Sequence, residues 1–249
     1  GLGEEVFLSF LPLSHAYEHV GGIYFPICLG AQIYYAERVD TLINNMAEVR
    51  PTIMTAVPRL YETMRSRIHQ GLKVQSNFRR GMFEKTLALG SKRYENSKSL
   101  SLWDKLLDAI CERLVRNKIR ERFGGRLKAL VSGGAPLNYD VGLFFTALGV
   151  RILQGYGQTE ASPVISANIP SNVKLHAVGP PARGVSAKIA DDGEILVSGE
   201  MVMLGYWNDP DATIATLSDD GWLHTGDIGH IDEDGHIVIT DRKKDIIVN

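Results

Sequence analysis

Residues 155–160 read Gly-Tyr-Gly-Gln-Thr-Glu, and this stretch decides how the fold is interpreted. The apolar residues 150–153 before it predict a buried strand, so we expect the stretch to form a tight turn where that strand ends. Open α/β folds bind their ligands at the carboxyl ends of sheet strands. The position of the stretch therefore predicts a ligand-binding turn in an α/β fold.

The side chains of this predicted turn suit a nucleotide and its metal ion. Gly155 and Gly157 allow turn conformations or the close approach of a ligand, and Tyr156 offers a ring on which a base can lie. Thr159 offers a hydroxyl to a phosphate oxygen or to Mg²⁺, and Glu160 offers the anionic oxygen that Mg²⁺ prefers. Taken alone, the same residues are also typical of a glycine-rich turn with a helix-capping threonine.

Three further motifs accompany this stretch: SGGAPL at 132–137, WLHTGD at 222–227 and DRKKD at 241–245. In order and spacing, the four resemble the later core motifs of the AMP-forming acyl-CoA synthetases of the adenylate-forming superfamily. PLSHAYE at 12–18 and AVPRLYE at 56–62 are most like the long-chain fatty acid branch. The resemblance covers essentially the whole chain. It implies an internal fragment without the family's upstream phosphate loop and C-terminal mobile domain, so we expect little ligase activity from the isolated chain.

The resemblance also implies a nucleotide site. Asp227 would accept hydrogen bonds from the ribose diol, and Arg242 would be the second ribose contact, with a fixed charge that also suits a phosphate. Without that context, Asp227 is equally typical of a hairpin turn, and Arg242 of a solvated surface. Lys244 would be the hinge to the mobile domain, a position where few residues absorb a rotation.

Small residues follow a second predicted strand in the SGGAPL motif. Gly133, Gly134 and Ala135 would let an adenine ring and an acyl chain lie against the backbone, although a tight strand-to-helix turn explains these residues equally well. His15 would orient or gate the acyl group, with a structural or helix-capping role as the alternative.

The implied reaction has two half-reactions. A fatty acid carboxylate attacks the α-phosphorus of ATP to give acyl-AMP and pyrophosphate, and CoA thiolate then displaces AMP. Positioning and charge neutralisation carry such a transfer, so Thr159 and Glu160, with Mg²⁺, are the predicted catalytic residues beside His15. Two alternatives stay open: an acyl-AMP ligase that feeds a carrier protein, and a non-catalytic nucleotide or acyl-adenylate binding module.

Composition narrows the class of protein. The chain has 249 residues and a net charge of −2, which argues against a dedicated nucleic-acid binder. Cys28 and Cys111 match no metal or disulfide spacing, so a reducing cytoplasm is the predicted setting.

Residues 20–36 carry no charge but fall short of the roughly 20 apolar residues of a spanning helix, and we expect a buried helix and a strand there. Peripheral contact with the inner face of a membrane and the oligomeric state stay open.

The coarse pattern predicts an α/β fold with mostly parallel sheets, flanking helices and a small antiparallel β subdomain. Predicted strands at 6–11, 31–35, 52–56 and 127–132 alternate with helices, and short strands at 185–189, 194–198 and 236–240 follow. We expect an α/β subdomain over 1–174 with a helical insert at about 65–123, a β subdomain over 175–241, and the start of the hinge at 242–249.

Overall fold

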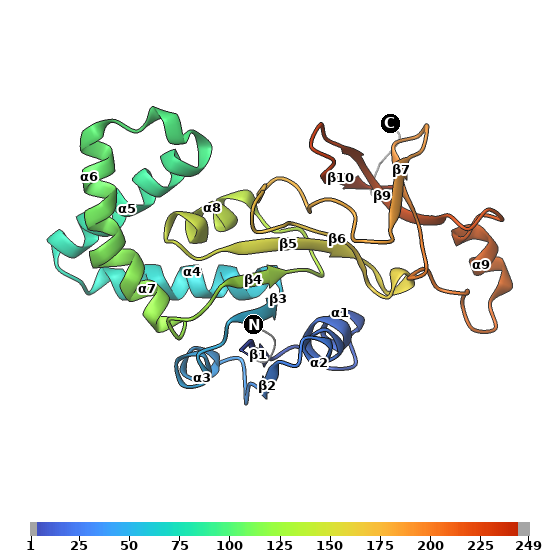
Figure 1. Ribbon diagram of the computed structural model, residues 1–249, viewed down its shortest axis with the longest axis horizontal. Helices are drawn as coiled ribbons and strands as arrows, with labels where there is room; N and C mark the ends of the chain where they lie inside the picture. Colours follow the sequence, from blue (N-terminus) through green and yellow to red (C-terminus); the bar gives the residue numbers. More distant parts are fainter. Residues whose placement is uncertain (1–3, 244–249) are drawn as a thin grey trace. The chain divides into compact units, whose positions relative to one another are not determined.

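A computed structural model describes residues 4–243 of the chain (Figure 1). These residues pack into two compact units. Unit 1 contains the described residues up to Leu13 together with Gly21–Ile152, and unit 2 contains Ser14–Val20 together with the described residues from Leu153 onward. The units are considered separately below, and the subdomain boundaries expected near residues 174 and 241 stay predictions.

A parallel sheet lies at the centre of unit 1. It contains β1 (Val6–Ser9), β2 (Gln32–Tyr35), β3 (Ile53–Ala56) and β4 (Ala129–Ser132), in the order β2-β1-β3-β4. Each neighbouring pair is parallel. The backbone N–H of Leu130 in β4 donates to the carbonyl of Arg151, just before the next strand. β1, β3 and β4 are largely buried, and parallel strands covered on both faces are apolar along their length, which is why the sequence pattern located these three. The edge strand β2, also predicted, is mostly exposed.

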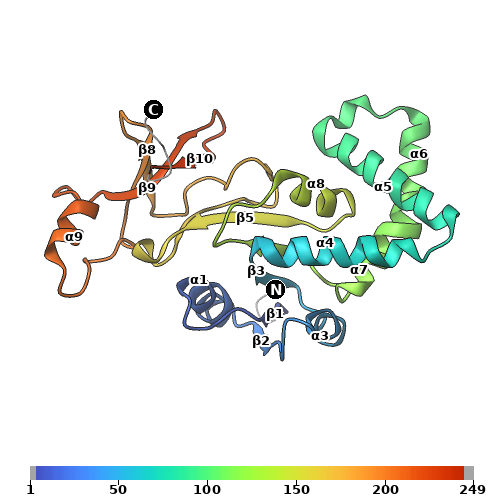
Figure 2. The ribbon, with the colours of Figure 1, turned by 180° about the vertical axis from the view of Figure 1, so that it is seen from behind.

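Helices connect these strands and extend beyond them. They are α2 (Phe25–Cys28), α3 (Leu42–Val49), α4 (Pro58–Lys73), α5 (Asn77–Glu95), α6 (Leu102–Cys111), α7 (Asn117–Arg122) and α8 (Tyr139–Ala147), with a 3-10 turn η2 (Ser97–Ser99) and a π-helical turn η3 (Glu112–Arg116). In Figures 1 and 2, α5, α6 and α7 lie together at the end of α4 that is farther from the strands. Side chains cap three starts: Ser76 for α5, Ser101 for α6 and Asn138 for α8.

The core of unit 1 joins the sheet to α4 and α8. Tyr61 of α4 and Phe145 of α8 are fully buried, with ring centroids 5.8 Å apart in an edge-on arrangement. Met54 and Leu130 of the central strands belong to the same cluster. Because this cluster contains residues from distant parts of the sequence, it fixes the strand ends that carry the SGGAPL motif.

Two apolar segments of unit 1 are less buried than the sequence pattern predicts. The helix expected to be buried within residues 20–36 is instead a π-helical turn η1 (His19–Tyr24) followed by α2, in which Tyr24, Phe25 and Ile27 are about half exposed. The apolar stripe of α6, predicted to pack on the core, is also largely exposed at Trp103 and Leu106. Hydrophobic periodicity identifies a helix, but the surface that it contacts depends on the tertiary fold. Among the described residues, no helix is long and apolar enough to cross a membrane.

Unit 2 is built mainly from antiparallel strands. β5 (Ile152–Gly157) pairs with β6 (Val164–Ala167), and a separate sheet has the order β10-β9-β8-β7. Its strands are β7 (Ser186–Ile189), β8 (Glu194–Ser198), β9 (Leu223–Ile231) and β10 (Ile237–Arg242). The unit also contains α1 (Ala16–Glu18), a 3-10 turn η4 (Thr159–Ala161) and α9 (Pro210–Thr216). Together with unit 1, this confirms the predicted class: mostly parallel α/β with a small antiparallel sheet.

Two predicted turns are in fact strands. The prediction that a turn begins at Gly155 was wrong, because β5 continues to Gly157 through an antiparallel partner that the local pattern does not reveal. Asp227 does not lie in a hairpin turn after Thr225 and Gly226, because β9 runs through all three residues. Neither β6 nor β9 was among the predicted strands.

Candidate functional site

Tyr156 and Asp227 are joined by a short hydrogen bond inside unit 2. The Tyr156 hydroxyl, on β5, donates to Asp227 Oδ2, on β9, over 2.6 Å. Burial, followed by the hydrogen bond to Asp227, raises the pKa of Tyr156 far above its ordinary value. The phenol therefore stays protonated and acts as a fixed donor to the carboxylate.

Arg242 supplies the second partner of Asp227. The two residues face each other across the β9–β10 pair, and Arg242 Nε lies 3.1 Å from Asp227 Oδ1. The Asp227 side chain is only 4% exposed, whereas that of Arg242 is 70% exposed. The backbone N–H of Asp227 donates to Thr225 Oγ1, and this hydroxyl donates to the Ile195 carbonyl. The carboxylate is thus held by Tyr156 of β5 and Arg242 of β10, and the Asp227 backbone by Thr225.

This cluster of Tyr156, Asp227 and Arg242 retains capacity for a ligand. Each carboxylate oxygen can accept two hydrogen bonds, and one bond to each oxygen leaves a second acceptor position. The exposed guanidinium of Arg242 carries donors and a fixed positive charge. A buried carboxylate with spare acceptor positions, beside an exposed cation, has the chemistry needed for a diol next to a phosphate.

Thr159 and Glu160 lie on η4, directly after β5. The Tyr206 hydroxyl donates to Glu160 Oε1 over 2.8 Å, and this bond, followed by burial, raises the pKa of Tyr206 above its usual range. The Glu160 carbonyl accepts from the Met203 N–H, which ties η4 to the segment before α9. Thr159 is exposed.

Among residues 4–243, no group of three or more His, Cys, Asp or Glu side chains is arranged to hold a metal ion. Mg²⁺ in nucleotide enzymes is typically bound by one or two carboxylates plus substrate phosphates and water. The single partly buried carboxylate of Glu160, next to the Thr159 hydroxyl, fits that mode of binding. It does not fit a site made of protein ligands alone.

Gly157 is required by packing rather than by a turn. A Cβ atom at this position would lie 1.7 Å from the Pro163 carbonyl oxygen, so only glycine lets β5 and β6 approach as they do. Its backbone does not have the positive φ expected of a glycine-dependent turn. The close approach foreseen for a ligand is thus made by the protein's own backbone. Gly155 faces Ala167 in the same strand pair.

The SGGAPL residues belong to unit 1. The Gly133 N–H donates to the Ala56 carbonyl, Gly134 has a φ of +81°, and Gly134 and Ala135 are exposed. The buried Ser132 Oγ before them has no hydrogen-bond partner among the described residues. The strand therefore ends in exposed backbone, as an apolar or aromatic ligand face would require.

His15 is the N-cap of α1, and its Nδ1 accepts a hydrogen bond from the Tyr17 N–H over 3.2 Å. This is the capping arrangement weighed for it from the sequence, and a role toward an acyl group stays a prediction. Lys244, the predicted hinge, lies outside the described residues.

Sequence reasoning missed a second carboxylate cluster, centred on Glu194 at the start of β8. The Glu194 side chain is buried, and it accepts from the Gly226 N–H over 2.8 Å and from Lys243 Nζ over 2.9 Å. His224 Nδ1 lies 3.0 Å from its Oε2. Burial alone would raise the pKa of Glu194, but these contacts outweigh it and hold the pKa below the usual value.

Through these contacts, Glu194 holds the residue before Asp227 and the residue after Arg242. Gly226 immediately precedes Asp227, and Lys243 immediately follows Arg242. The available signal was a carboxylate at the start of the apolar run 194–198, an unusual place for an unpaired charge. No corresponding signal pointed to Tyr206.

Known proteins resemble the chain over almost its full length. The AMP-binding enzyme family matches residues 2–207. The putative fatty-acid–CoA ligase fadD11 of Mycobacterium tuberculosis is 34% identical over 97% of the chain. The peroxisomal long chain acyl-CoA synthetase 7 of Arabidopsis thaliana is 36% identical over 97% of the chain. The chain spans 43% and 36%, respectively, of the lengths of these two relatives.

Solved structures show the same fold. ATP-bound MatB from Rhodopseudomonas palustris aligns with 99% of the chain at a TM-score of 0.71 and 24% identity, and the chain covers 42% of it. At that identity the likeness concerns the fold alone. Because the family match spans well over half of the sequence, the chain belongs to the AMP-binding enzyme family.

Proposed function

We propose that the chain is part of a long-chain fatty acid–CoA ligase that activates a fatty acid with ATP and transfers the acyl group to CoA. The observation that carries the proposal is the cluster of Tyr156, Asp227 and Arg242, with distances of 2.6 and 3.1 Å to the two carboxylate oxygens. The relatives named as fatty-acid–CoA ligases and long chain acyl-CoA synthetases support the substrate class.

In this proposal, Asp227 accepts hydrogen bonds from the ribose hydroxyls of ATP and then of the acyl-adenylate. Tyr156 keeps the carboxylate oriented, because its hydroxyl remains a donor at all physiological pH values. Arg242 adds a second contact to the ribose or to the α-phosphate through its exposed guanidinium. Holding the nucleotide in this way favours in-line attack by the fatty acid carboxylate on the α-phosphorus.

Thr159 and Glu160 are the proposed groups on the phosphate side. The Thr159 hydroxyl would donate to a phosphate oxygen, and Glu160, steadied by Tyr206, would hold Mg²⁺. When bound there, Mg²⁺ would neutralise phosphate charge as pyrophosphate leaves. The acyl-adenylate then reacts at its carbonyl carbon with the CoA thiolate, and AMP departs.

The remaining predicted residues have supporting roles in the proposal. Gly133, Gly134 and Ala135 would offer exposed backbone to the adenine ring and the acyl chain. His15 would orient the acyl group, and Lys244 would be the hinge toward a mobile domain. Contact with a membrane surface, through which fatty acids are supplied, also stays part of the proposal.

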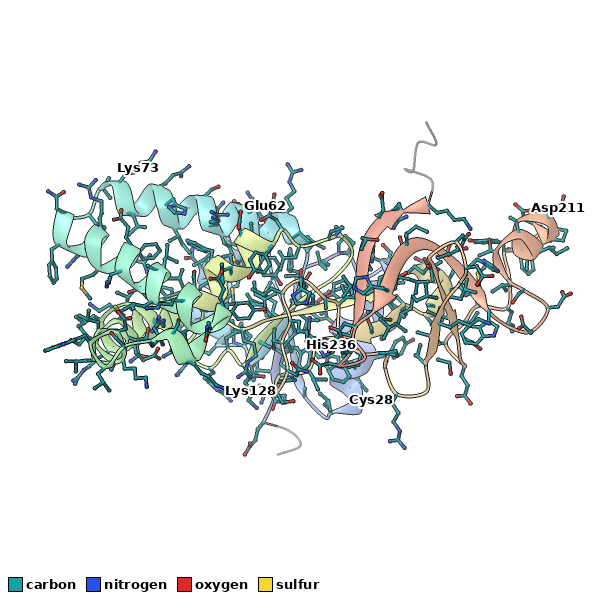
Figure 3. The ribbon with its side chains drawn as sticks, turned by 90° about the horizontal axis from the view of Figure 1, so that it is seen from above. Cys28, Glu62, Lys73, Lys128, Asp211 and His236 are labelled. Carbon is teal, nitrogen blue, oxygen red and sulfur yellow. The ribbon has the colours of Figure 1, made fainter. Side chains whose placement is uncertain are left out.

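Titration calorimetry of the full-length protein with non-hydrolysable acyl-adenylate analogues of increasing chain length tests this function. Asp227→Asn keeps the shape of the side chain but removes its charge, so we expect analogue affinity to fall about 10- to 100-fold, the loss typical of hydrogen bonds to a charged group. Asp211→Asn is the matched control, because Asp211 lies on the exposed helix α9 (Figure 3).

A catalytic readout separates the alternatives. Fatty-acid-dependent exchange of labelled pyrophosphate into ATP is expected for a ligase, and its absence despite tight analogue binding would favour a non-catalytic binding module. Exchange without acyl-CoA formation, but with transfer to a carrier protein, would identify an acyl-AMP ligase. Equal analogue affinity for Asp227→Asn and the unsubstituted protein would contradict the proposed ribose contact.

A further inference from the structure

The helices of unit 1 border a cavity of about 850 Å³ that is open to solvent and is lined by none of the residues proposed above for the nucleotide. It is lined by α3, α4, α5, η3 and α7. Its deepest walls are apolar and are formed by Ile43, Met64, Leu72, Phe83, Ile119 and Phe123. The volume lies within the range of cavities that bind small molecules, roughly 300–1,000 Å³.

Basic side chains surround this apolar interior. Arg67, Arg79, Lys118 and Arg122 line the cavity and are exposed, whereas Asp40 is the one acidic residue of the lining and is paired with Arg38. A cationic rim around an apolar interior is complementary to an anionic group attached to an apolar body.

Most of these cations lack a partner within the protein. In the part of the chain that the structure describes, no hydrogen bond or ion pair engages the side chains of Arg67, Lys118 or Arg122, and Arg79 donates to the neutral Gln75. Long basic side chains can lay their alkyl stems on apolar surface while the charged ends stay in water. The three unpaired cations are therefore free to bind an anion at the cavity rim.

Exposed apolar side chains also line the cavity. Val74, Phe78 and Leu114 line the cavity and are 83%, 73% and 44% exposed. Exposed apolar side chains that continue into an apolar cavity mark a path for a hydrophobic ligand, because each methylene buried contributes about 0.8 kcal/mol. The apolar interior, the exposed apolar side chains and the basic side chains of the cavity together fit an elongated amphiphile.

We propose that this cavity binds one single-chain amphiphile with an anionic head, the acyl chain lying among the apolar walls and the head at Arg67, Lys118 and Arg122. The carboxylate of a free fatty acid and the phosphate of a single-chain phospholipid share this chemistry. The site is separate from the proposed adenylate site and does not depend on it.

Gly71, near the end of α4, provides a direct way to block the cavity. It lines the cavity, and a Cβ atom built on it would meet nothing within 4 Å. Gly71→Trp is therefore expected to place its ring in the cavity without a clash at Cβ, and replacing a helical glycine also removes a conformational cost. Gly81 in α5 likewise has open space over its Cβ position but does not line the cavity. Gly81→Trp is thus a matched control.

The experiment is calorimetric binding to the full-length protein, first saturated with an acyl-adenylate analogue so that a substrate site is already occupied. The probes are dodecanoate, dodecyl phosphate and dodecyltrimethylammonium, each below its micelle concentration. We expect a saturable site for the two anions, binding at least about tenfold weaker for the cation, and loss of the site in Gly71→Trp but not in Gly81→Trp.

A charge-reversal pair tests the head group. Arg67→Glu with Lys118→Glu should weaken anion binding about tenfold or more. Lys73→Glu on α4 with Arg113→Glu on η3, the turn before α7, changes the net charge equally at residues outside the lining and should leave binding unchanged. Lys73 lies at the outer side of α4 (Figure 3).

Several results would overturn the proposal. The first is that the unsubstituted protein binds neither anionic probe. The second is that Gly71→Trp binds the anionic probes as tightly as the unsubstituted protein does. The third is that the unsubstituted protein binds the cationic probe as tightly as the anionic probes. A dimer that Gly71→Trp dissociates while dodecanoate binding persists would instead assign this surface to a second copy of the chain. A preference between dodecanoate and dodecyl phosphate distinguishes the fatty acid from the phospholipid as the source of the ligand. The adenylate analogue must bind the two tryptophan variants equally, which separates this result from failure of the proposed ligase site.

Discussion

Arg116 in unit 1 and Asp227 in unit 2 are both buried charges, yet they are held in opposite ways. The Arg116 side chain is 0% exposed, and its donors are used inside the protein. Nε donates to the Ala147 carbonyl and Nη2 to Asp108 Oδ1, both over 2.7 Å. Asp227 is also nearly buried, but its partner Arg242 reaches solvent.

The two charges differ in whether their partners are available to a ligand. The hydrogen bonds of Arg116 end on α5, α6, α8 and η3, and Glu112, its partner that is 39% exposed, pairs in turn with Arg120. The charge therefore ties helices together. The contacts of Asp227 lead through Arg242 to the surface. Buried charge alone is therefore weak grounds for a functional site. A buried charge is stronger grounds when its exposed partner makes no further ion pair, as is the case for Arg242 among the described residues.

Removing the structural charge should have the largest effect on stability. Arg116→Met leaves the Ala147 carbonyl without its arginine donor and deprives Asp108 of one of its two cations, Arg116 and Arg93. Breaking a buried pair typically costs about 3–5 kcal/mol, and we expect about 3 kcal/mol because Asp108 keeps Arg93. Urea denaturation followed by circular dichroism measures this loss.

The neighbouring Arg113 provides the control. It lies in the same π-helical turn and is exposed, so Arg113→Met should change the unfolding free energy by less than about 0.5 kcal/mol. Equal stability of the two variants would show that Arg116 does not tie the helices together, and the contrast with Asp227 would fail.

Gly157 lies in the stretch at residues 155–160 that was predicted to bind a nucleotide, and it tests whether a residue of that stretch has a structural role instead. Because a Cβ atom there would lie 1.7 Å from the Pro163 carbonyl oxygen, Gly157→Ala should lower the unfolding free energy by about 1–3 kcal/mol through overpacking. Gly81→Ala, where the space is open, should instead raise it by roughly 0.5–1 kcal/mol. If Gly157→Ala unfolds normally but loses affinity for the adenylate analogue, Gly157 contacts the ligand and its structural assignment is wrong.

Local signals in the sequence were sufficient for much of the fold. The four parallel strands are apolar runs, Pro58 begins α4, and Asn138 caps α8 through bonds to the Asp140 and Val141 N–H groups. Each of these features depends on residues within a few positions of one another. That is the range over which periodicity, helix starts and caps carry information.

Features that depend on distant partners could not be predicted in this way. β5 extends past Gly155 because β6, about ten residues later, supplies its ladder bonds. Tyr206 reaches Glu160 across 46 positions, and Glu194 reaches Lys243 across 49. The motif order located Asp227 and Arg242, but only the register of β9 and β10 explains why the two residues face each other.

The smallest expected effect concerns the ion pair of Asp232 with Lys174, which serves as a reference for the two buried charges. A hydrogen bond from Lys174, followed by bonds from the His236 and Asp234 N–H groups, lowers the pKa of Asp232 to about 2. An unfolded Asp titrates near 3.9. A depressed pKa in the folded state means that this stabilisation is present above about pH 4 and is lost as the pH falls toward about 2.

Asp232→Asn should therefore flatten the acid limb of stability between about pH 4 and pH 2. The effect should be smaller than either effect above, because the Asp232 and Lys174 side chains still reach solvent and ion pairs open to solvent contribute little. The measurement is thermal denaturation of both proteins across that range at low and high salt, with exposed Asp219→Asn as the control. An unchanged difference between the unsubstituted protein and Asp232→Asn across the range would contradict the lowered pKa.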